Sequence, residues 1–101
     1  MNPTLALSPS EEAEVKAILA AHLSPEVRVG VFGSRATGHA KPWSDLDLAL
    51  SGPGPISLVV MAALAEAFEE APLPWKVDLV DLACASPEFK RVITSSLIPL
   101  R

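Results

Sequence analysis

Hydrophobic and polar residues follow two different periods along this chain, and the two periods alternate. Apolar residues spaced three or four positions apart predict three helices, at residues 9–23, 57–70 and 86–94. Runs of β-branched or alternating residues predict three strands, at residues 27–32, 45–51 and 75–82. Helices that alternate with strands are typical of a small two-layer α/β domain.

Each predicted helix begins at a serine, and the first helix has the fullest start signal. Ser8 stands before Pro9, and Glu11 follows three positions after Ser8. A serine cap, a proline in the first turn and a glutamate at the third position together predict a capping box. Pro25 marks the end of this helix, because proline cannot continue one.

The apolar stripes of the second and third helices indicate which residues face the core. In the second helix they are Leu58, Met61, Leu64, Ala65 and Phe68, and in the third they are Phe89, Val92 and Ile93.

Length and composition bound the class of protein. The chain has 101 residues, half of them hydrophobic, which suits a single domain spanning residues 1–101. Its formal net charge is −4 and its eight Lys and Arg residues are scattered, which argues against stable nucleic-acid binding. No signal peptide and no apolar run of about 18 residues is evident. With Cys84 as the single cysteine, we expect a cytoplasmic protein that does not bind a membrane.

Two carboxylates, Asp45 and Asp47, lie two positions apart in the second predicted strand. Side chains at positions i and i+2 of a strand point to the same face, with Cα atoms about 6.5–7 Å apart. Both carboxylates can therefore converge on a divalent cation, while the leucines between and after them face the core. Phosphoryl-transfer sites with two metal ions need such clustered carboxylates.

A turn suited to phosphate precedes these carboxylates. The apolar run 27–32 ends at Gly33, whose missing Cβ lets the backbone approach a ligand closely. Ser34 opens a short helical turn that Gly38 closes, and the free N–H groups at a helix start favour phosphate. Arg35 is either a surface charge at this helix start or a phosphate contact.

The order Gly33-Ser34, ten residues, then Asp45-Leu46-Asp47 resembles the motif of the polymerase-β-like nucleotidyltransferases. Within that superfamily the chain is similar to the minimal nucleotidyltransferase (MNT) domains, antitoxins found beside HEPN toxins. The resemblance implies that Gly33 and Ser34 hold the triphosphate of a nucleotide and that the two aspartates bind Mg²⁺. It also implies a mixed sheet with a three-stranded core and helices packed on one side.

The family also uses a third carboxylate, on a later strand, where this chain has Asp78 and Asp81. Because these residues differ by three positions, they face opposite sides of a strand and only one can join the site. Asp78 is the better match to the family. The resemblance thus implies that Asp45, Asp47 and Asp78 are the catalytic residues and the ligands of two Mg²⁺ ions.

The resemblance further implies an activity. ATP would be the donor, and AMP would be attached to a tyrosine of a partner HEPN toxin; because this chain contains no tyrosine, it would act in trans. The alternative is a catalytically weak nucleotide-binding module that neutralises its partner by steric occlusion. Many MNT domains have a basic residue where this chain has Thr37, which leaves Arg35 and Lys41 as cationic contacts.

Two features admit more than one interpretation. Trp43 precedes Asp45 in a loop and could stack on a base, whereas Trp75 is assigned to packing. The apolar segment 95–101, in which Pro99 discourages a helix, either packs back on the sheet or forms a surface that meets a partner.

Overall fold

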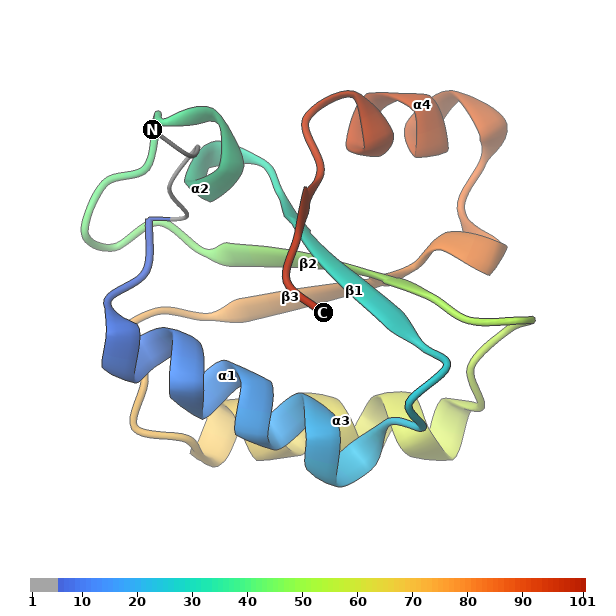
Figure 1. Ribbon diagram of the computed structural model, residues 1–101, viewed down its shortest axis with the longest axis horizontal. Coiled ribbons are helices and arrows are strands. Elements are labelled where there is room, and N and C mark those ends of the chain that lie inside the picture. The colour runs from blue at the N-terminus through green and yellow to red at the C-terminus, as the bar shows by residue number, and fades with distance from the viewer. Residues whose placement is uncertain (1–5) are drawn as a thin grey trace.

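The structure is a computed structural model, and it describes residues 6–101. Helices and strands follow one another in the predicted order (Figure 1). The helices are α1 (Pro9–His22), α2 (Ser34–Thr37), α3 (Leu58–Glu70), the 3₁₀ turn η1 (Leu82–Cys84) and α4 (Pro87–Ser95). The strands are β1 (Arg28–Phe32), β2 (Leu46–Ser51), β3 (Val77–Asp81) and β4 (Ile98–Pro99).

The strands form one mixed sheet in the order β3-β2-β1-β4. β1 pairs antiparallel with β2 and with β4, whereas β2 and β3 run parallel. The predicted α/β fold with a mixed three-stranded core is confirmed, and β4 adds a short fourth strand. The parallel register places Asp47 directly opposite Asp78, so that two neighbouring strands deliver carboxylates to the same place.

Serine caps fix where the three longer helices begin. The N–H of Glu11 donates to Ser8 Oγ over 3.1 Å, and the N–H of Ser8 donates to Glu11 Oε1 over 2.9 Å. This is the predicted capping box, and it pairs N–H groups that the ends of a helix otherwise leave free. Ser57 and Ser86 cap α3 and α4 through their own side-chain oxygens.

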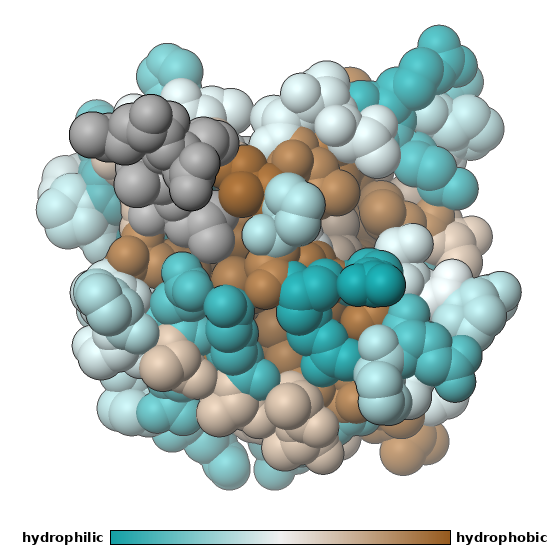
Figure 2. All heavy atoms as spheres, in the orientation of Figure 1, coloured by the Kyte–Doolittle hydropathy of each residue, from teal (hydrophilic) through white to brown (hydrophobic). Residues whose placement is uncertain are grey.

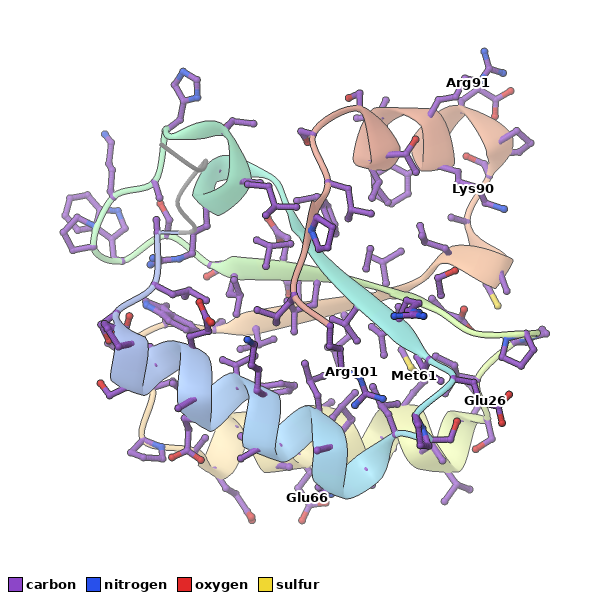
Figure 3. The ribbon with its side chains drawn as sticks, viewed as in Figure 1. Glu26, Met61, Glu66, Lys90, Arg91 and Arg101 are labelled. Atoms are coloured by element: carbon purple, nitrogen blue, oxygen red, sulfur yellow. The ribbon has the colours of Figure 1, made fainter. Side chains whose placement is uncertain are left out.

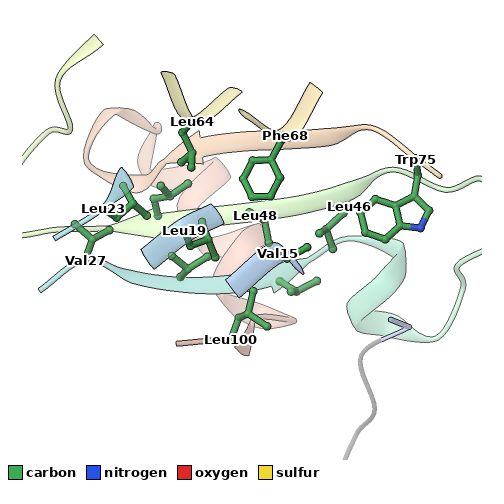
Figure 4. Close-up of a cluster of buried hydrophobic side chains, with 13 residues drawn as sticks. Val15, Leu19, Leu23, Val27, Leu46, Leu48, Leu64, Phe68, Trp75 and Leu100 are labelled. Atoms are coloured by element: carbon green, nitrogen blue, oxygen red, sulfur yellow. The ribbon is translucent and has the colours of Figure 1, made fainter. Parts of the chain in front are cut away.

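The main core lies between the sheet and two helices, α1 and α3, which cover one of its faces (Figures 1 and 4). Leu46, Leu48 and Leu50 of β2 belong to this core and are fully buried. Val15 and Leu19 of α1 are also fully buried there. Because burying one leucine side chain contributes about 1.5–3 kcal/mol, this face is the main source of stability.

The other face of the sheet is covered only in part, by α4. A smaller apolar cluster joins Ile93 of α4 to Ala49 of β2 and Leu82 of η1. Phe89 packs edge-on against Phe32, with ring centroids 6.4 Å apart. Helices therefore lie on both sides of the sheet rather than on one side, because apolar residues also occupy part of its second face.

Four residues assigned to the core by their helical spacing are exposed instead, among them Phe89, which is 44 % exposed. Leu58 is 86 % exposed, Val92 is 65 % exposed, and Ala65 also lies at the surface. Successive helical positions are about 100° apart, so Leu58 is turned about 120° from the buried Leu64. For the same reason Val92 is turned about 100° from the buried Ile93.

The apolar segment near the C-terminus folds onto its own sheet. Ile98 and Pro99 pair with β1, and Leu100 is 7 % exposed within the main core. A Cβ added at Gly30 would come within 2.6 Å of Leu97, so the segment lies close against β1. Of the two interpretations of residues 95–101, the structure shows packing on the sheet, and it does not show a free surface for a partner.

A hydrogen bond from Arg101 holds the end of this segment beside α1 (Figure 3). Its Nη2 donates to the carbonyl oxygen of Ser24 over 2.6 Å. The space-filling view shows apolar side chains through the middle of this face and polar side chains over α1 (Figure 2). Within the described part of the chain, none of the helices has the length and apolar character that crossing a membrane requires.

Candidate functional site

The turn between β1 and α2 requires glycine at its first position. Gly33 has φ +75° and ψ −155°, a region that residues with a Cβ rarely adopt. Its carbonyl oxygen accepts hydrogen bonds from the N–H groups of Ala36 over 3.0 Å and Thr37 over 3.2 Å, and these bonds begin α2. Gly38, with φ +82°, ends the helix in the left-handed conformation. The predicted helical turn at Ser34–Thr37 is confirmed.

Gly33 also packs directly against Asp47. The residue before it, Phe32, pairs with Asp47 across β1 and β2. A Cβ added at Gly33 would collide with Asp47 Oδ2. The two halves of the motif are therefore in contact, and this position needs glycine both for its backbone conformation and for the room it leaves.

Three carboxylates gather near the first residues of β2 and β3. Asp47 and Asp78 are opposite each other in the register, and Asp45 lies exposed just before β2. Partial burial raises the pKa of Asp47, and the negative charges of Asp78 and then Asp45 raise that pKa further, as does a hydrogen bond with Asp78. The raised pKa means that full ionisation of the three carboxyl groups is unfavourable here, and a bound cation would offset that cost.

The donor atoms at this place fit a hard divalent cation. Mg²⁺ prefers carboxylate oxygens, and one or two carboxylates suffice when nucleotide phosphates and waters supply the other ligands. Among residues 6–101 the only ion pair joins Lys16 to Glu12, so no cationic side chain pairs with the three aspartates. Within these same residues no group of three or more His, Cys, Asp or Glu side chains is placed so that it could hold a metal ion by itself. The site is thus an open pair, Asp47 and Asp78, with Asp45 beside it.

Asp81 has a different set of contacts. Its Oδ2 accepts a hydrogen bond from the N–H of Ile56 over 2.8 Å, and its Oδ1 accepts one from the N–H of Ala83 over 3.0 Å. It therefore caps η1 and anchors the residues that lead into α3. Asp78, three positions earlier, lies opposite Asp47, and the odd separation of the two aspartates places them on opposite faces of β3.

Arg35 is not the surface charge that one of its two interpretations describes, because its side chain is buried. Its side chain is only 4 % exposed, and its guanidinium donates to backbone carbonyl groups of the loop 41–44. Two of the three guanidinium nitrogens, Nε and Nη2, are thus engaged by the loop. The large side chain that this loop presents to solvent is Trp43, which is 71 % exposed, with Lys41 Nζ 5.9 Å from the centre of its ring.

A buried contact between Arg35 and Trp75 belongs to the same neighbourhood. The guanidinium carbon lies 4.7 Å from the centre of the Trp75 ring. No local sequence pattern indicates this contact, because β2 and α3 separate the two residues along the chain.

Comparison with known sequences identifies relatives of the chain. Residues 13–100 match the family described as Polymerase beta, Nucleotidyltransferase. Over 84 residues the chain is 43 % identical to the "Probable protein adenylyltransferase MntA" of Haemophilus influenzae, which corresponds to 83 % of this chain and 74 % of the relative.

Solved structures of toxin–antitoxin complexes contain chains with a similar fold. A crystal structure of a toxin–antitoxin with AMP-PNP contains a chain that superposes with a TM-score of 0.75 and 25 % identity, covering 89 % of this chain and 72 % of that one. A complex of the tri-AMPylated Shewanella oneidensis HEPN toxin with its MNT antitoxin shares the fold, with a TM-score of 0.68 and 23 % identity over 89 % of this chain and 68 % of that one.

The family match spans the motif, the sheet and the helices that carry the site. The resemblance to minimal nucleotidyltransferases, first indicated by the spacing of Gly33, Ser34, Asp45 and Asp47, is confirmed. The chain therefore belongs to the polymerase beta nucleotidyltransferase family.

Proposed function

We propose that this protein transfers AMP from ATP to a hydroxyl group of a partner protein, and that the partner is a HEPN-type toxin inactivated by the transfer. One observation carries the proposal: the Gly33 turn touches Asp47, which lies opposite Asp78, so a phosphate-binding turn meets paired carboxylates. The identity to the MntA relative supports the reaction type. The similarity to a toxin–antitoxin with AMP-PNP supports the nucleotide and the kind of partner.

The parts of the site have separate roles in this reaction. Gly33 and Ser34 bind the triphosphate at the start of α2. Asp45 and Asp47 would hold Mg²⁺ beside the triphosphate, and Asp78 would contribute to a second metal site and take up the proton of the acceptor hydroxyl. Bound Mg²⁺ would supply positive charge to the phosphate oxygens. The acceptor oxygen forms a bond to the α-phosphorus as the bond to pyrophosphate breaks.

The acceptor must come from another molecule if it is a tyrosine, as the MNT resemblance implies, because this chain has none. The sheet order supports access for such a molecule. β3 is an edge strand, and Asp78 on that strand is exposed. A side chain of a partner can therefore reach Asp78 from the side of the sheet.

A second function, neutralisation by steric occlusion with the nucleotide as a ligand only, is favoured by one observation. Arg35 is the only cation in the segment 33–38, and its guanidinium is used by the loop 41–44. The phosphate turn thus lacks a cationic side chain of its own. Both functions predict a stable complex, so binding to the toxin does not separate them.

Transfer of label to the partner separates the two functions. A candidate partner toxin of the HEPN type is incubated with this protein, with Mg²⁺ and with ATP labelled on the α-phosphate. We expect label on the toxin with the wild type and none with Asp47→Asn, although the complex stays intact. Glu66→Gln is the matched control, because Glu66 is an exposed acid on α3, on the far side of the core (Figure 3). A wild-type complex that forms without labelling would favour occlusion.

A further inference from the structure

We propose that Arg35 is a positioning residue that holds three parts of the site in one arrangement: the phosphate turn, the loop before Asp45 and the segment before β3. The expected consequence, tighter binding of Mg²⁺-nucleotide, rests on the proposed function. The contacts that carry the inference involve backbone groups and one aromatic ring.

Backbone carbonyl groups surround the guanidinium of Arg35 on its loop side. Nε and Nη2 both donate to the carbonyl oxygen of Ser44, over 3.0 and 2.8 Å. Nη2 also donates to the carbonyl oxygens of Pro42 over 3.3 Å and Lys41 over 3.4 Å. Because Ser44 directly precedes Asp45, these hydrogen bonds fix where that carboxylate enters the site.

The same side chain reaches two further segments. Nη1 donates to the carbonyl oxygen of Ala6, and the N–H of Ala6 donates to the carbonyl oxygen of Arg35 over 3.3 Å. The flat face of the guanidinium lies over the ring of Trp75, which is 8 % exposed. Trp75 stands just ahead of β3 and three positions before Asp78. One side chain therefore touches the approaches to both acidic strands.

Arg35 is a buried cation that forms no ion pair within the described residues. Burying a charge is costly unless its donors are paired, and here carbonyl oxygens and an aromatic face take the place of a carboxylate. The planar guanidinium has five N–H donors in a fixed fork, whereas a lysine ammonium has three on a flexible stem. A lysine at this position therefore cannot hold the loop and the Trp75 ring in the same way.

The loop that Arg35 holds has no helix or strand of its own between α2 and β2. Within residues 41–44 a second side-chain anchor is local, from the N–H of Lys41 to Ser44 Oγ over 2.8 Å. Without Arg35 this loop, and Asp45 with it, would sample more positions. A ligand binds more tightly to groups that are already ordered, because the entropy of ordering is lost on folding and not on binding.

The central test is the affinity for Mg²⁺-AMP-PNP, measured by isothermal titration at a temperature at which every variant is folded. Loss of groups that orient metal ligands weakens metal binding by about 10- to 100-fold, and we expect a loss of this size for Arg35→Lys and a greater one for Arg35→Met. Arg28→Lys, at an exposed position of β1, controls for the substitution itself. Ile93→Val, in the cluster under α4, controls for lost stability.

A second measurement follows the loop directly. The two tryptophans of the protein report on the contacts of Arg35, because Trp75 lies under its guanidinium and Trp43 lies in the loop that it holds. In a Trp75→Phe background the fluorescence comes from Trp43 alone. We expect the fluorescence anisotropy of Trp43 to fall when Arg35→Lys is added to this background and to stay constant when Arg28→Lys is added.

The outcomes separate the inference from the function on which it rests. Weaker nucleotide binding together with a more mobile Trp43, in a variant with unchanged circular dichroism, supports positioning by Arg35. Equal affinity of Arg35→Lys and the wild type overturns the inference and leaves the proposed function standing. The same loss of affinity in Ile93→Val at a matched Tm also overturns it, because the effect would then be one of general stability. A wild type that does not bind the nucleotide overturns the proposed function first.

Discussion

The two faces of the sheet are built from alternate residues of the same strands but differ in what covers them. On β2, Leu46, Leu48 and Leu50 face α1 and α3 and are fully buried, while Asp47 and Ala49 face the other way. On the second face α4 covers the apolar part (Figure 1), whereas Asp45 and Asp78 on the acidic part are exposed. One face can hold repelling carboxylates because the other supplies the stability of the fold.

A strand with two such faces separates function from stability at the level of single residues. Neighbours in the sequence should therefore respond to substitution in opposite ways. A change on the acidic side should affect chemistry and leave the fold intact, and a change on the helix side should do the reverse.

The comparison is tested most strongly on β3, where Asp78 and Asp81 face different surroundings. Asp78→Asn removes a carboxylate from the proposed site, and we expect transfer of AMP to fall by about 100-fold or more. Asp81→Asn weakens the contacts to the N–H groups of Ile56 and Ala83, and we expect a loss of about 0.5–2 kcal/mol in the free energy of unfolding with transfer retained. Transfer assays and thermal denaturation of both variants measure this. The reverse ranking would show that Asp81 is the catalytic residue.

The helix-covered face is tested by shortening one of its leucines. Leu48→Ala leaves a cavity between β2 and the helices, and we expect the free energy of unfolding to fall by about 2–5 kcal/mol. Leu58→Ala is the matched control, since Leu58 is 86 % exposed and should change stability by less than about 0.5 kcal/mol. Chemical denaturation gives both values. Similar losses at the two positions would contradict the assignment of the core.

Two glycines with positive φ sharpen the comparison at the phosphate turn. At Gly38 a Cβ would meet no atom within 4 Å. Gly38→Ala should therefore lower the free energy of unfolding by only about 1–2 kcal/mol, the strain of alanine in the left-handed conformation. Gly33→Ala adds a collision with Asp47 Oδ2, and we expect it to abolish binding of Mg²⁺-AMP-PNP. Calorimetric titration of the folded variants distinguishes the two effects. Nucleotide binding by Gly33→Ala at wild-type affinity would exclude Gly33 from the site.

The smallest expected effect is a dependence of stability on pH in the absence of metal. Burial and the charges of Asp78 and Asp45 raise the pKa of Asp47 in the folded state. The protonated carboxyl therefore stabilises the fold fully below the unfolded-state pKa, and this contribution is lost as the pH rises through the folded-state pKa. We expect Asp47→Asn, or added Mg²⁺, to reduce this loss in denaturation curves recorded across the acidic range. If the stability of the wild type and of Asp47→Asn depended on pH in the same way, repulsion between Asp47 and its acidic neighbours would be contradicted.

Features whose cause lies within a few residues were predictable from the sequence. The capping box of Ser8 and Glu11 depends on one helical turn, and the need for glycine at Gly33 depends on one backbone conformation. The alternation of Asp47 with Leu48 assigns one residue to each face, because strand side chains alternate. Strand parity likewise separated Asp78 from Asp81 before their contacts were known.

Features that depend on distant contacts were not predictable in the same way. The position of the Arg35 side chain depends on Trp75 and on the carbonyl groups of the loop 41–44. The turn segment 33–38, from which the role of Arg35 was predicted, contains none of these groups. The exposure of Val92 depends on how α4 meets the second face of the sheet. These outcomes follow from tertiary packing, which a helical or strand period in the sequence does not specify.

The pairing of β4 with β1 sets a constraint on the order in which the protein folds during synthesis. The N–H of Leu100 donates to the carbonyl oxygen of Val29 over 2.8 Å, so an early strand is completed by a segment that the ribosome makes much later. Closing so long a loop costs entropy before the contact returns any energy. A nascent chain would therefore carry β1 with one unpaired edge and a core without Leu100, and it would finish folding only when that segment emerges.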